Sequence, residues 1–299
     1  MSELGDDFRY MRKKIGRSIA PVKTLVYDYN KTLKEELGKL DFENVVYYPQ
    51  KINWIKRYLD DELYQICTDK YTVRNYVKEK GLGHLLNELY AVYDSVDEIE
   101  FDKLPDSFVL RTNHGCGWNI LCDDRSKLSV KHAKKKLRKW MKKNYYYVQG
   151  ECWYKDIKPR IICEKFLQDD TTEELKEYKI LCFHGNPHVI QVDIERNGKH
   201  MRNFYDTNWN LRDIYCEYEN DKRIIERPRD LEDMLEYARI LSEGFIHVRI
   251  DFFVVNEEVI FGKMSFAPES GVVRFTPISF LKEMGDLMKL PKISKNILM

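Results

Sequence analysis

The sequence contains no apolar stretch that approaches the roughly 20 residues needed to cross a membrane. Its opening residues, MSELGDDFRYMRKKIG, carry charges where a secretory signal peptide needs an apolar segment. Internal repeats, low-complexity tracts and long flexible linkers are also absent. We therefore expect a soluble, cytoplasmic protein that folds compactly.

Neither sign of charge is in excess. The 50 basic and 49 acidic residues leave a formal net charge of +1, so total charge gives no reason to expect a nucleic-acid partner. No CxxC pair and no zinc-finger spacing occurs among the cysteines. We predict that they are reduced thiols. They are Cys67, Cys116, Cys122, Cys152, Cys163, Cys182 and Cys216.

The pattern of apolar residues divides the chain into two regions. Residues 1–100 are predicted to be mostly helical, with the clearest segments at 51–63, 70–81 and 84–96. From Leu104 onward, short strand-like runs alternate with helices. The predicted strands are 107–114, 118–124, 159–167, 177–185, 244–255 and 259–266, and the predicted helices are 127–144 and 231–243. This order predicts an α+β fold with mainly antiparallel hairpins rather than a doubly wound parallel sheet.

Two local signals mark the ends of the helix predicted at 231–243. Asp230 can cap its N-terminus, with Asp233 three positions later, and Gly244 is expected to end it.

A turn with two glycines, His114-Gly115-Cys116-Gly117, separates the first two predicted strands. Backbone N–H groups in such a turn can approach an anion because no Cβ obstructs them. Arg111 on the incoming strand would add positive charge for a phosphate. The alternative is a purely structural turn, since the segment is neither a Walker loop nor a GxGxxG fingerprint.

The last predicted hairpin has one charged and one apolar side. His247, Arg249 and Asp251 point to one side of their strand, and the apolar residues between them point to the other. If 256–258 forms a three-residue loop, Asp251 lies opposite Lys263 and Arg249 lies opposite Ser265. The charged side is then either a functional site or a solvated sheet face with cross-strand ion pairs.

Seven blocks in order resemble the TupA-like ATP-grasp family, which is found among bacterial polysaccharide biosynthesis proteins. They are TDKYTVRNYVKEKG, LPDSFVLRTNHGCGWNI, KPRIICEKFL, EYKILCFHG, FYDTNWN, VRIDFFVV and FGKMSFAPESG. The resemblance implies an α+β ATP-grasp fold, in which two lobes clasp ATP. It implies a mostly helical N-terminal region at 1–100 and an ATP-grasp domain at 101–299. Within that domain, 101–167 would be the first ATP-binding lobe and 168–299 the second lobe with the metal and phosphate site.

The family resemblance also implies an activity. ATP, with Mg²⁺, would phosphorylate a carboxylate, and an amine would then attack the acyl phosphate. A carboxylate–amine ligase of this kind would attach an amino acid to a surface polysaccharide, such as a capsule, or to its precursor. Nothing in the residues themselves names these substrates.

The residues that match the family's motifs are expected to bind ATP and the metal. Arg111, Gly115 and Gly117 would contact phosphates, and the segment from Glu164 through Lys165 to Leu167 would face the adenine. The resemblance implies catalytic roles for Lys179 and Arg249 at the phosphates, where Lys179 would also help to bind ATP. It implies that Asp251 binds magnesium.

Position 263 departs from the family pattern. The family has a metal-binding glutamate where this chain has Lys263, and a protonated lysine offers no lone pair to a metal. Either the metal site is impaired, with Lys263 standing in for the metal, or Glu269 takes over as a ligand. In the first case the protein is an ATP- or glycan-binding pseudoenzyme.

Nine lysines and arginines lie in the predicted helical segment 127–143. One interpretation is a solvated basic face, with Leu137, Trp140 and Met141 toward the core. The other is a surface for a polyanion, such as an anionic glycan or an anionic membrane surface.

Overall fold

The computed structural model describes residues 3–169, 175–196 and 199–292. These residues divide into two compact units, each assembled from separate parts of the chain. The first unit comprises Met1–Asp60, Tyr147–Cys152 and Asp169–Met299, and the second comprises Asp61–Tyr146 and Trp153–Gln168. The predicted division at residue 100, and the lobes 101–167 and 168–299, stay a prediction. Within the described residues, no helix is both long enough and apolar enough to cross a membrane.

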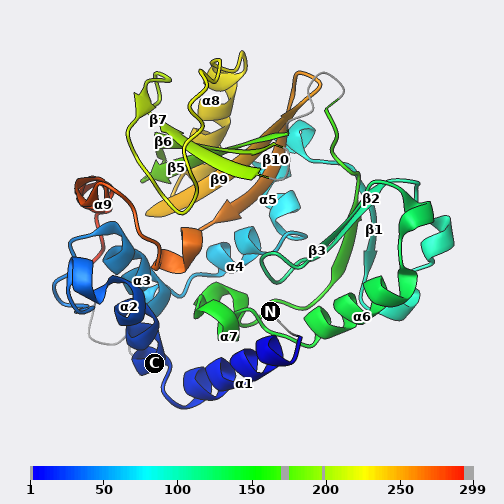
Figure 1. The fold of residues 1–299 in the computed structure, drawn as a ribbon, viewed down its shortest axis with the longest axis horizontal. Coiled ribbons are helices and arrows are strands. Elements are labelled where there is room, and N and C mark those ends of the chain that lie inside the picture. The colour runs from blue at the N-terminus through cyan, green and yellow to red at the C-terminus, as the bar shows by residue number, and fades with distance from the viewer. Residues whose placement is uncertain (1–2, 170–174, 197–198, 293–299) are drawn as a thin grey trace. The chain divides into compact units, whose positions relative to one another are not determined.

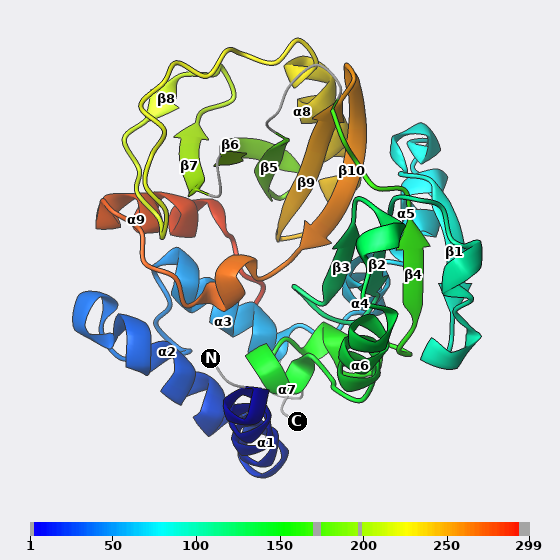
Figure 2. The same ribbon diagram turned by 45° about the vertical axis from the view of Figure 1, so that its right-hand side comes forward.

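The second unit is built on a four-stranded antiparallel sheet with the order β1-β4-β2-β3 (Figure 2). Its strands are β1 (Leu89–Tyr93), β2 (Phe108–Thr112), β3 (Asn119–Cys122) and β4 (Ile161–Glu164). Its helices are α4 (Glu62–Thr68), α5 (Val73–Glu79) and α6 (Val130–Met141). Ala133 and Leu137 of α6 pack with Phe108, Leu110 and Ile161 of the sheet in one hydrophobic core.

The helix predicted at 84–96 is wrong. Gly83–Leu85 forms a short 3-10 turn, Leu89–Tyr93 forms strand β1, and Val96 begins a second 3-10 turn, Val96–Glu98. Tyr90, Val92 and Tyr93 suit a strand better than a helix, and β4 offers a free edge with which β1 pairs. Long-range pairing therefore overrides the local helical spacing.

The first unit contains a six-stranded sheet with the order β10-β9-β5-β6-β7-β8 (Figure 1; β8 is labelled in Figure 2). Every strand pair in the described residues is antiparallel, so the predicted α+β class is confirmed. The strands are β5 (Lys176–Phe183), β6 (Asn186–Arg196), β7 (Lys199–Tyr205), β8 (Leu211–Arg212), β9 (His247–Val255) and β10 (Glu258–Ser265).

Helix α8 (Leu231–Ser242) packs against the central strands β5, β6 and β9. Met234, Leu235, Ala238 and Leu241 are buried, as the spacing predicts. Asp230 is the N-cap residue, but its side chain makes no capping hydrogen bond, so the predicted side-chain cap is wrong. Gly244 follows the helix with a φ of 85°, which glycine adopts without strain.

The remaining helices of the first unit come from both ends of the chain. They are α1 (Glu3–Ile19), α2 (Pro21–Leu37), α3 (Tyr48–Tyr58) and α9 (Ile278–Leu287), and the short α7 (Tyr146–Gln149) adds residues 147–149. Helix α3 packs against α9 and against the 3-10 turn Pro268–Gly271 that follows β10. The N-terminal helices are therefore part of the same unit as the last hairpin.

Candidate active site

Strands β9 and β10 pair in the predicted register. Asp251 lies opposite Lys263, and Arg249 lies opposite Ser265. These side chains come from neighbouring positions on the side of the sheet away from α8. The structure therefore brings the charged residues of the last hairpin together.

The turn that joins these strands differs from the prediction. It has two residues, Asn256 and Glu257, and their φ values of 50° and 65° are those of a type I′ turn. The register then shifts by one residue at Gly262, where a Cβ would lie 2.9 Å from the carbonyl oxygen of Asp251. A glycine β-bulge, rather than a longer loop, therefore produces the pairing of Asp251 with Lys263.

The charged side of strand β9 is buried. Only 5% of Arg249 and none of Asp251 is exposed, so the alternative of a solvated sheet face is wrong. Arg249 donates from Nε to Oδ1 of Asp251 at 2.8 Å and from Nη2 to Oδ2 at 3.0 Å. Burial alone would raise the pKa of Asp251, but the charges of Arg249, Lys263 and Lys179 outweigh burial and lower it.

Lysines and carboxylates alternate across this face. Nζ of Lys263 lies 3.1 Å from Oδ2 of Asp251 and 3.8 Å from Oε1 of Glu177. Nζ of Lys179 lies 2.8 Å from Oε2 of Glu177 and also donates to Asp193. The predicted catalytic residues Lys179 and Arg249 therefore belong to one ionic network.

Sequence reasoning missed the part of this network on β6 and β7. Asp193 accepts hydrogen bonds from Nε of Arg202 at 2.6 Å and from Nη2 at 3.0 Å. Gln191 donates to the same carboxylate at 3.1 Å. The available signal was the alternation of Gln191 and Asp193 with Ile190 and Val192 along one strand.

Glu269 lies in a turn with unusual backbone geometry. Glu269, Ser270 and Gly271 have φ values of 48°, 56° and 64°. Asn53 donates to the carbonyl oxygen of Gly271 at 2.8 Å, and Lys56 donates to that of Ser270 at 2.9 Å. Two polar side chains of α3, neither of them predicted, therefore hold the turn.

This turn places Glu269 beside the charged network. Oε1 of Glu269 lies 3.5 Å from Nη1 of Arg249. Lys56, which supports the turn from α3, is itself buried, and burial lowers its pKa to about 8.

The carboxylates of the network do not fit a Mg²⁺ ion in this arrangement. Both oxygens of Asp251 bond to Arg249, and Lys263 occupies the neighbouring position. Glu269 contacts Arg249. In the described parts of the chain, no group of three or more His, Cys, Asp or Glu side chains could hold a metal. Metal binding by Asp251 and Glu269 stays a prediction, and it would require Lys263 to move.

In the second unit, Arg111 and Glu164 come together on neighbouring strands. Nε of Arg111 lies 3.0 Å from Oε2 of Glu164, and Nη1 of Arg74 lies 3.1 Å from Oε1. The side chain of Arg111 is 25% exposed. The carboxylate therefore holds two arginines while leaving part of Arg111 accessible.

Two backbone polar groups directly after β4 already form hydrogen bonds within the second unit. The N–H of Lys165 donates to the carbonyl of Glu88 at 3.0 Å, and its carbonyl accepts from Asn87 at 2.9 Å. Adenine contacts by Glu164, Lys165 and Leu167 stay a prediction.

Both glycines of the β2–β3 turn have a structural role, Gly115 through close packing and Gly117 through its backbone conformation. A Cβ on Gly115 would lie 2.2 Å from the Trp118 ring, and Gly117 has a φ of 70°. Lys70 donates to the carbonyl of Gly115. The structural alternative accounts for these glycines, and phosphate contact by the turn stays a prediction.

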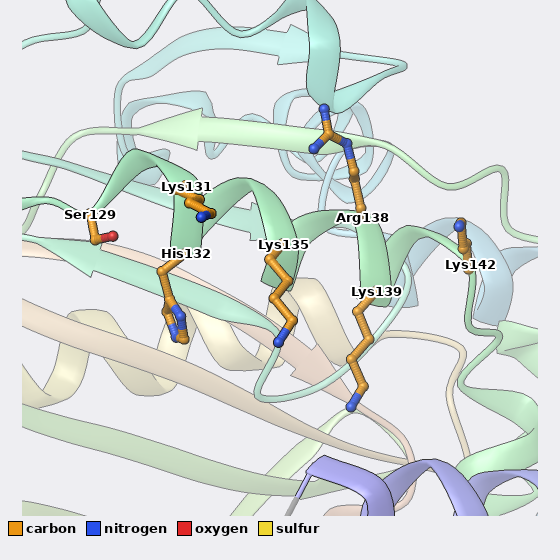
Figure 3. A pocket seen from close by; sticks show the side chains of 7 residues that line it. All are labelled: Ser129, Lys131, His132, Lys135, Arg138, Lys139 and Lys142. Atoms are coloured by element: carbon orange, nitrogen blue, oxygen red, sulfur yellow. The ribbon is translucent and has the colours of Figure 1, made fainter.

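Helix α6 has the two faces that the sequence predicts. Leu137 is fully buried, and Trp140 and Met141 pack against the core of the second unit. A hollow of about 720 Å³ runs along the other side (Figure 3). Ser129, His132 and five basic residues line it, and the lining contains no acidic residue. The five are Lys131, Lys135, Arg138, Lys139 and Lys142.

His247 belongs to the core and lies neither at a surface nor in an open site. It is fully buried, with Nε2 2.9 Å from the Tyr48 hydroxyl and Nδ1 2.9 Å from the Cys182 carbonyl. Burial lowers the pKa of His247 to about 3, so the ring is neutral at physiological pH.

Comparisons with known proteins concern the fold and the family. The model of the TupA-like ATP-grasp family matches residues 50–289. No curated protein matches the chain. Among solved structures, D-alanine–D-alanine ligase from Bacillus anthracis complexed with ATP is 14% identical, with a TM-score of 0.40. The alignment covers 67% of this chain and 55% of that one.

Two further solved structures resemble the chain. D-alanine–D-alanine ligase from Helicobacter pylori is 17% identical with a TM-score of 0.38, over 76% of this chain and 62% of that one. N5-carboxyaminoimidazole synthetase from Staphylococcus aureus complexed with ADP is 15% identical with a TM-score of 0.36, over 67% and 44%. The chain thus spans less than two thirds of the length of each. Because the family model matches most of this sequence, the chain belongs to the TupA-like ATP-grasp family and has the α+β ATP-grasp fold.

Proposed function

We propose that the protein is an ATP-dependent carboxylate–amine ligase that acts through an acyl phosphate. Family membership supports the reaction class. The observation that carries the proposal in this chain is the ionic network in which buried Arg249 and Lys179 are joined to partly exposed Lys263 through carboxylates. The resemblance to the family's motifs implies phosphate and metal binding at these positions. Three fixed cations on one face can neutralise charge on a phosphoryl group as it is transferred.

The proposed reaction has two steps. A carboxylate oxygen of the substrate attacks the γ-phosphorus of ATP, the bond to the β–γ bridging oxygen breaks, and ADP leaves. An amine then attacks the acyl carbon, inorganic phosphate leaves with the bonding electrons, and the nitrogen loses a proton. A uronic acid of a surface polysaccharide and an amino acid are the substrates that the family resemblance favours.

Individual residues have proposed roles in this reaction. Arg111, Gly115 and Gly117 contact phosphates, and the backbone from Glu164 to Leu167 contacts the adenine. Lys179 and Arg249 neutralise the transferred group. No step is assigned to Mg²⁺, because Asp251 is engaged by Arg249 and Lys263.

One observation favours a second candidate, a nucleotide-binding protein without turnover. Lys263 already supplies a cation to Asp251, at the position where the family pattern has a metal-binding glutamate. Losing a metal ligand commonly impairs phosphoryl transfer, because positioning and charge neutralisation are most of the catalysis.

An ADP-release assay separates these candidates. Purified protein is incubated with ATP, glucuronate and an amino-acid mixture, and each component is omitted in turn. The ligase is expected to release ADP only when the carboxylate and the amine are both present. Thermal stabilisation by ATP without ADP release would favour the second candidate. Absence of stabilisation by ATP would overturn both.

The Arg111→Gln variant tests the phosphate role in the second unit. We expect ATP affinity to fall about tenfold, because a charge-assisted contact to phosphate is lost. Exposed Lys23 provides the control variant Lys23→Gln, which should leave affinity unchanged. Equal affinities for the wild-type protein and Arg111→Gln would contradict the assignment.

We further propose that the basic hollow along α6 binds the acidic glycan that carries the carboxylate. An amphipathic helix that enters a membrane exposes its apolar side, whereas the apolar side of α6 is packed into the core. The lining of the hollow also contains no Phe, Tyr or Trp side chain on which bases could stack. The basic hollow can therefore attract a soluble polyanion through its positive charge.

Binding of polygalacturonate tests this surface. The double variant Lys131→Gln/Lys142→Gln is expected to weaken binding several-fold at low salt, and added salt should remove the difference. Lys23→Gln/Lys39→Gln removes the same charge from exposed positions elsewhere and is the matched control. Equal losses in the two double variants would contradict a specific site, and preferential binding of anionic vesicles would indicate a membrane instead.

A further inference from the structure

Helix α1 exposes an apolar stripe. Phe8 is 76% exposed, Met11 and Ile15 are each 53% exposed, and Ile19 is 80% exposed. Their spacings of three, four and four residues place all four side chains on one side of the helix. Isolated exposed apolar residues are ordinary, but four in one row on a single helix are not.

The opposite side of α1 attaches the helix to the first unit through charged groups. Arg17 is only 3% exposed, and it contacts Oδ2 of Asp28 at 2.5 Å and the carbonyl of Tyr147 at 3.0 Å. Lys13 donates to the carbonyl of Val148 at 2.8 Å. An amphipathic helix normally packs its apolar side inward. Helix α1, drawn in dark blue beside α2 in Figure 2, does the reverse.

Basic residues flank the exposed stripe on both sides. At 100° per residue, Arg9 and Arg12 follow one edge of the stripe, and Lys14 follows the other, where Asp7 also lies. All three basic residues are exposed. A helix with an apolar stripe, a charged opposite side and lysine or arginine beside the stripe is the pattern of helices that lie in the interface of anionic membranes.

We propose that α1 is a membrane-surface helix that binds anionic phospholipid. Phe8, Met11, Ile15 and Ile19 enter the boundary between headgroups and acyl chains. Arg12 and Lys14 contact lipid phosphates. The contacts of Lys13 and Arg17 hold the helix on the protein in the orientation that leaves the stripe outward. This inference does not depend on the proposed ligase activity.

Charge favours lipid over a second copy of the chain as the occupant. Pairing the stripes of two copies would bring two sets of Arg9, Arg12 and Lys14 toward the same seam. Anionic headgroups instead supply a negative charge for each of them. The apolar stripe would be removed from water by either partner. The flanking charges therefore decide between lipid and a second copy of the chain.

Flotation of the full-length protein with vesicles tests the proposal. We expect binding to vesicles that mix phosphatidylcholine with phosphatidylglycerol, and much weaker binding to phosphatidylcholine alone. Ile15→Gln/Ile19→Gln should reduce binding by at least about tenfold, because the variant loses two apolar side chains whose transfer from water into the membrane favours binding. Both positions are exposed, so the variant should fold normally.

Two further variants separate charge from apolar burial. Arg12→Gln/Lys14→Gln should weaken binding to the anionic vesicles and make the remaining binding less sensitive to salt, since fewer charges remain to be screened. Leu121→Gln, at a 64% exposed position of β3, is the apolar control and should bind as the wild-type protein does. Failure of the wild-type protein to bind anionic vesicles would overturn the proposal. So would a wild-type dimer that becomes monomeric in Ile15→Gln/Ile19→Gln.

Discussion

Replacing Lys263 with glutamate is expected to make ATP binding depend on magnesium. The substitution removes the ammonium group 3.1 Å from Asp251 and puts a second carboxylate beside it. Two neighbouring carboxylates in a buried site repel each other unless a cation joins them. Mg²⁺ then becomes the natural partner, with oxygen ligands from both side chains. We expect ATP affinity in the variant to rise at least about tenfold when Mg²⁺ is added, or ~1.4 kcal/mol.

Calorimetry with and without Mg²⁺ measures this effect. Lys263→Met is the matched control, because it removes the ammonium group and provides no metal ligand. In the wild-type protein and in Lys263→Met, we expect ATP binding to depend only weakly on Mg²⁺. If ATP binding by the wild-type protein already depends strongly on Mg²⁺, Lys263 does not block the metal. The ion would then displace Lys263 from Asp251 when it binds.

Asp193→Ala is expected to destabilise the first unit by about 3–5 kcal/mol. Asp193 is only 4% exposed and accepts hydrogen bonds from Arg202 and Lys179, which are themselves 3% and 6% exposed. Without the carboxylate, two buried cations lose a principal partner. Removing one member of a buried ionic network costs far more than removing an exposed ion pair.

Denaturant unfolding followed by circular dichroism tests this prediction. Asp94→Ala is the control, because Asp94 also contacts two cations, Lys158 at 2.8 Å and Arg160 at 3.2 Å, but its side chain is 55% exposed. The control should change the free energy of unfolding by less than about 1 kcal/mol. Similar losses of unfolding free energy in Asp193→Ala and Asp94→Ala would show that burial does not make the contacts of Asp193 stronger.

The same carboxylate predicts an acid limit to stability. Burial alone would raise the pKa of Asp193, but Arg202 and Lys179 outweigh burial and lower it below the ordinary value of 3.8. Because the folded-state pKa is depressed, the stabilisation is fully present above the ordinary pKa and is lost as pH falls below it. Unfolding of the isosteric Asp193→Asn variant should therefore depend less on pH in that acid range than unfolding of the wild-type protein.

Local sequence patterns predicted the elements whose signals lie within a few neighbouring residues. The strands around Arg111 and around Asp251 and the helices α6 and α8 appear as expected. Strand β1 was predicted as a helix, because its residues have helical spacing and only the edge of β4 makes them a strand. The pairing of Asp251 with Lys263 was predicted correctly from an incorrect loop length, since the bulge at Gly262 compensates for the shorter turn.

The candidate site likewise contains residues that local patterns identify and residues that only long-range contacts bring into place. Arg249, Asp251 and Lys179 could be selected from strand alternation and from the family's motifs. Arg202 could not, because it reaches Asp193 only through the pairing of β6 with β7. Asn53 and Lys56 lie more than 200 positions before the turn that they support. A contact between such distant segments leaves no periodic signal in either one.

The sequence by itself determined the family, the α+β class with mainly antiparallel hairpins and the side of the last hairpin on which its charges lie, because periodicity and turn residues act over short distances. Only the tertiary structure decided which charged sides are buried. The face of β9 was equally compatible with water and with a site until packing left Asp251 fully covered. The apolar side of α1 lies outward, while the contacts of Arg17 hold the opposite side of the helix against the first unit. Burial depends on what the rest of the chain places against a surface, and alternation along one element cannot specify that.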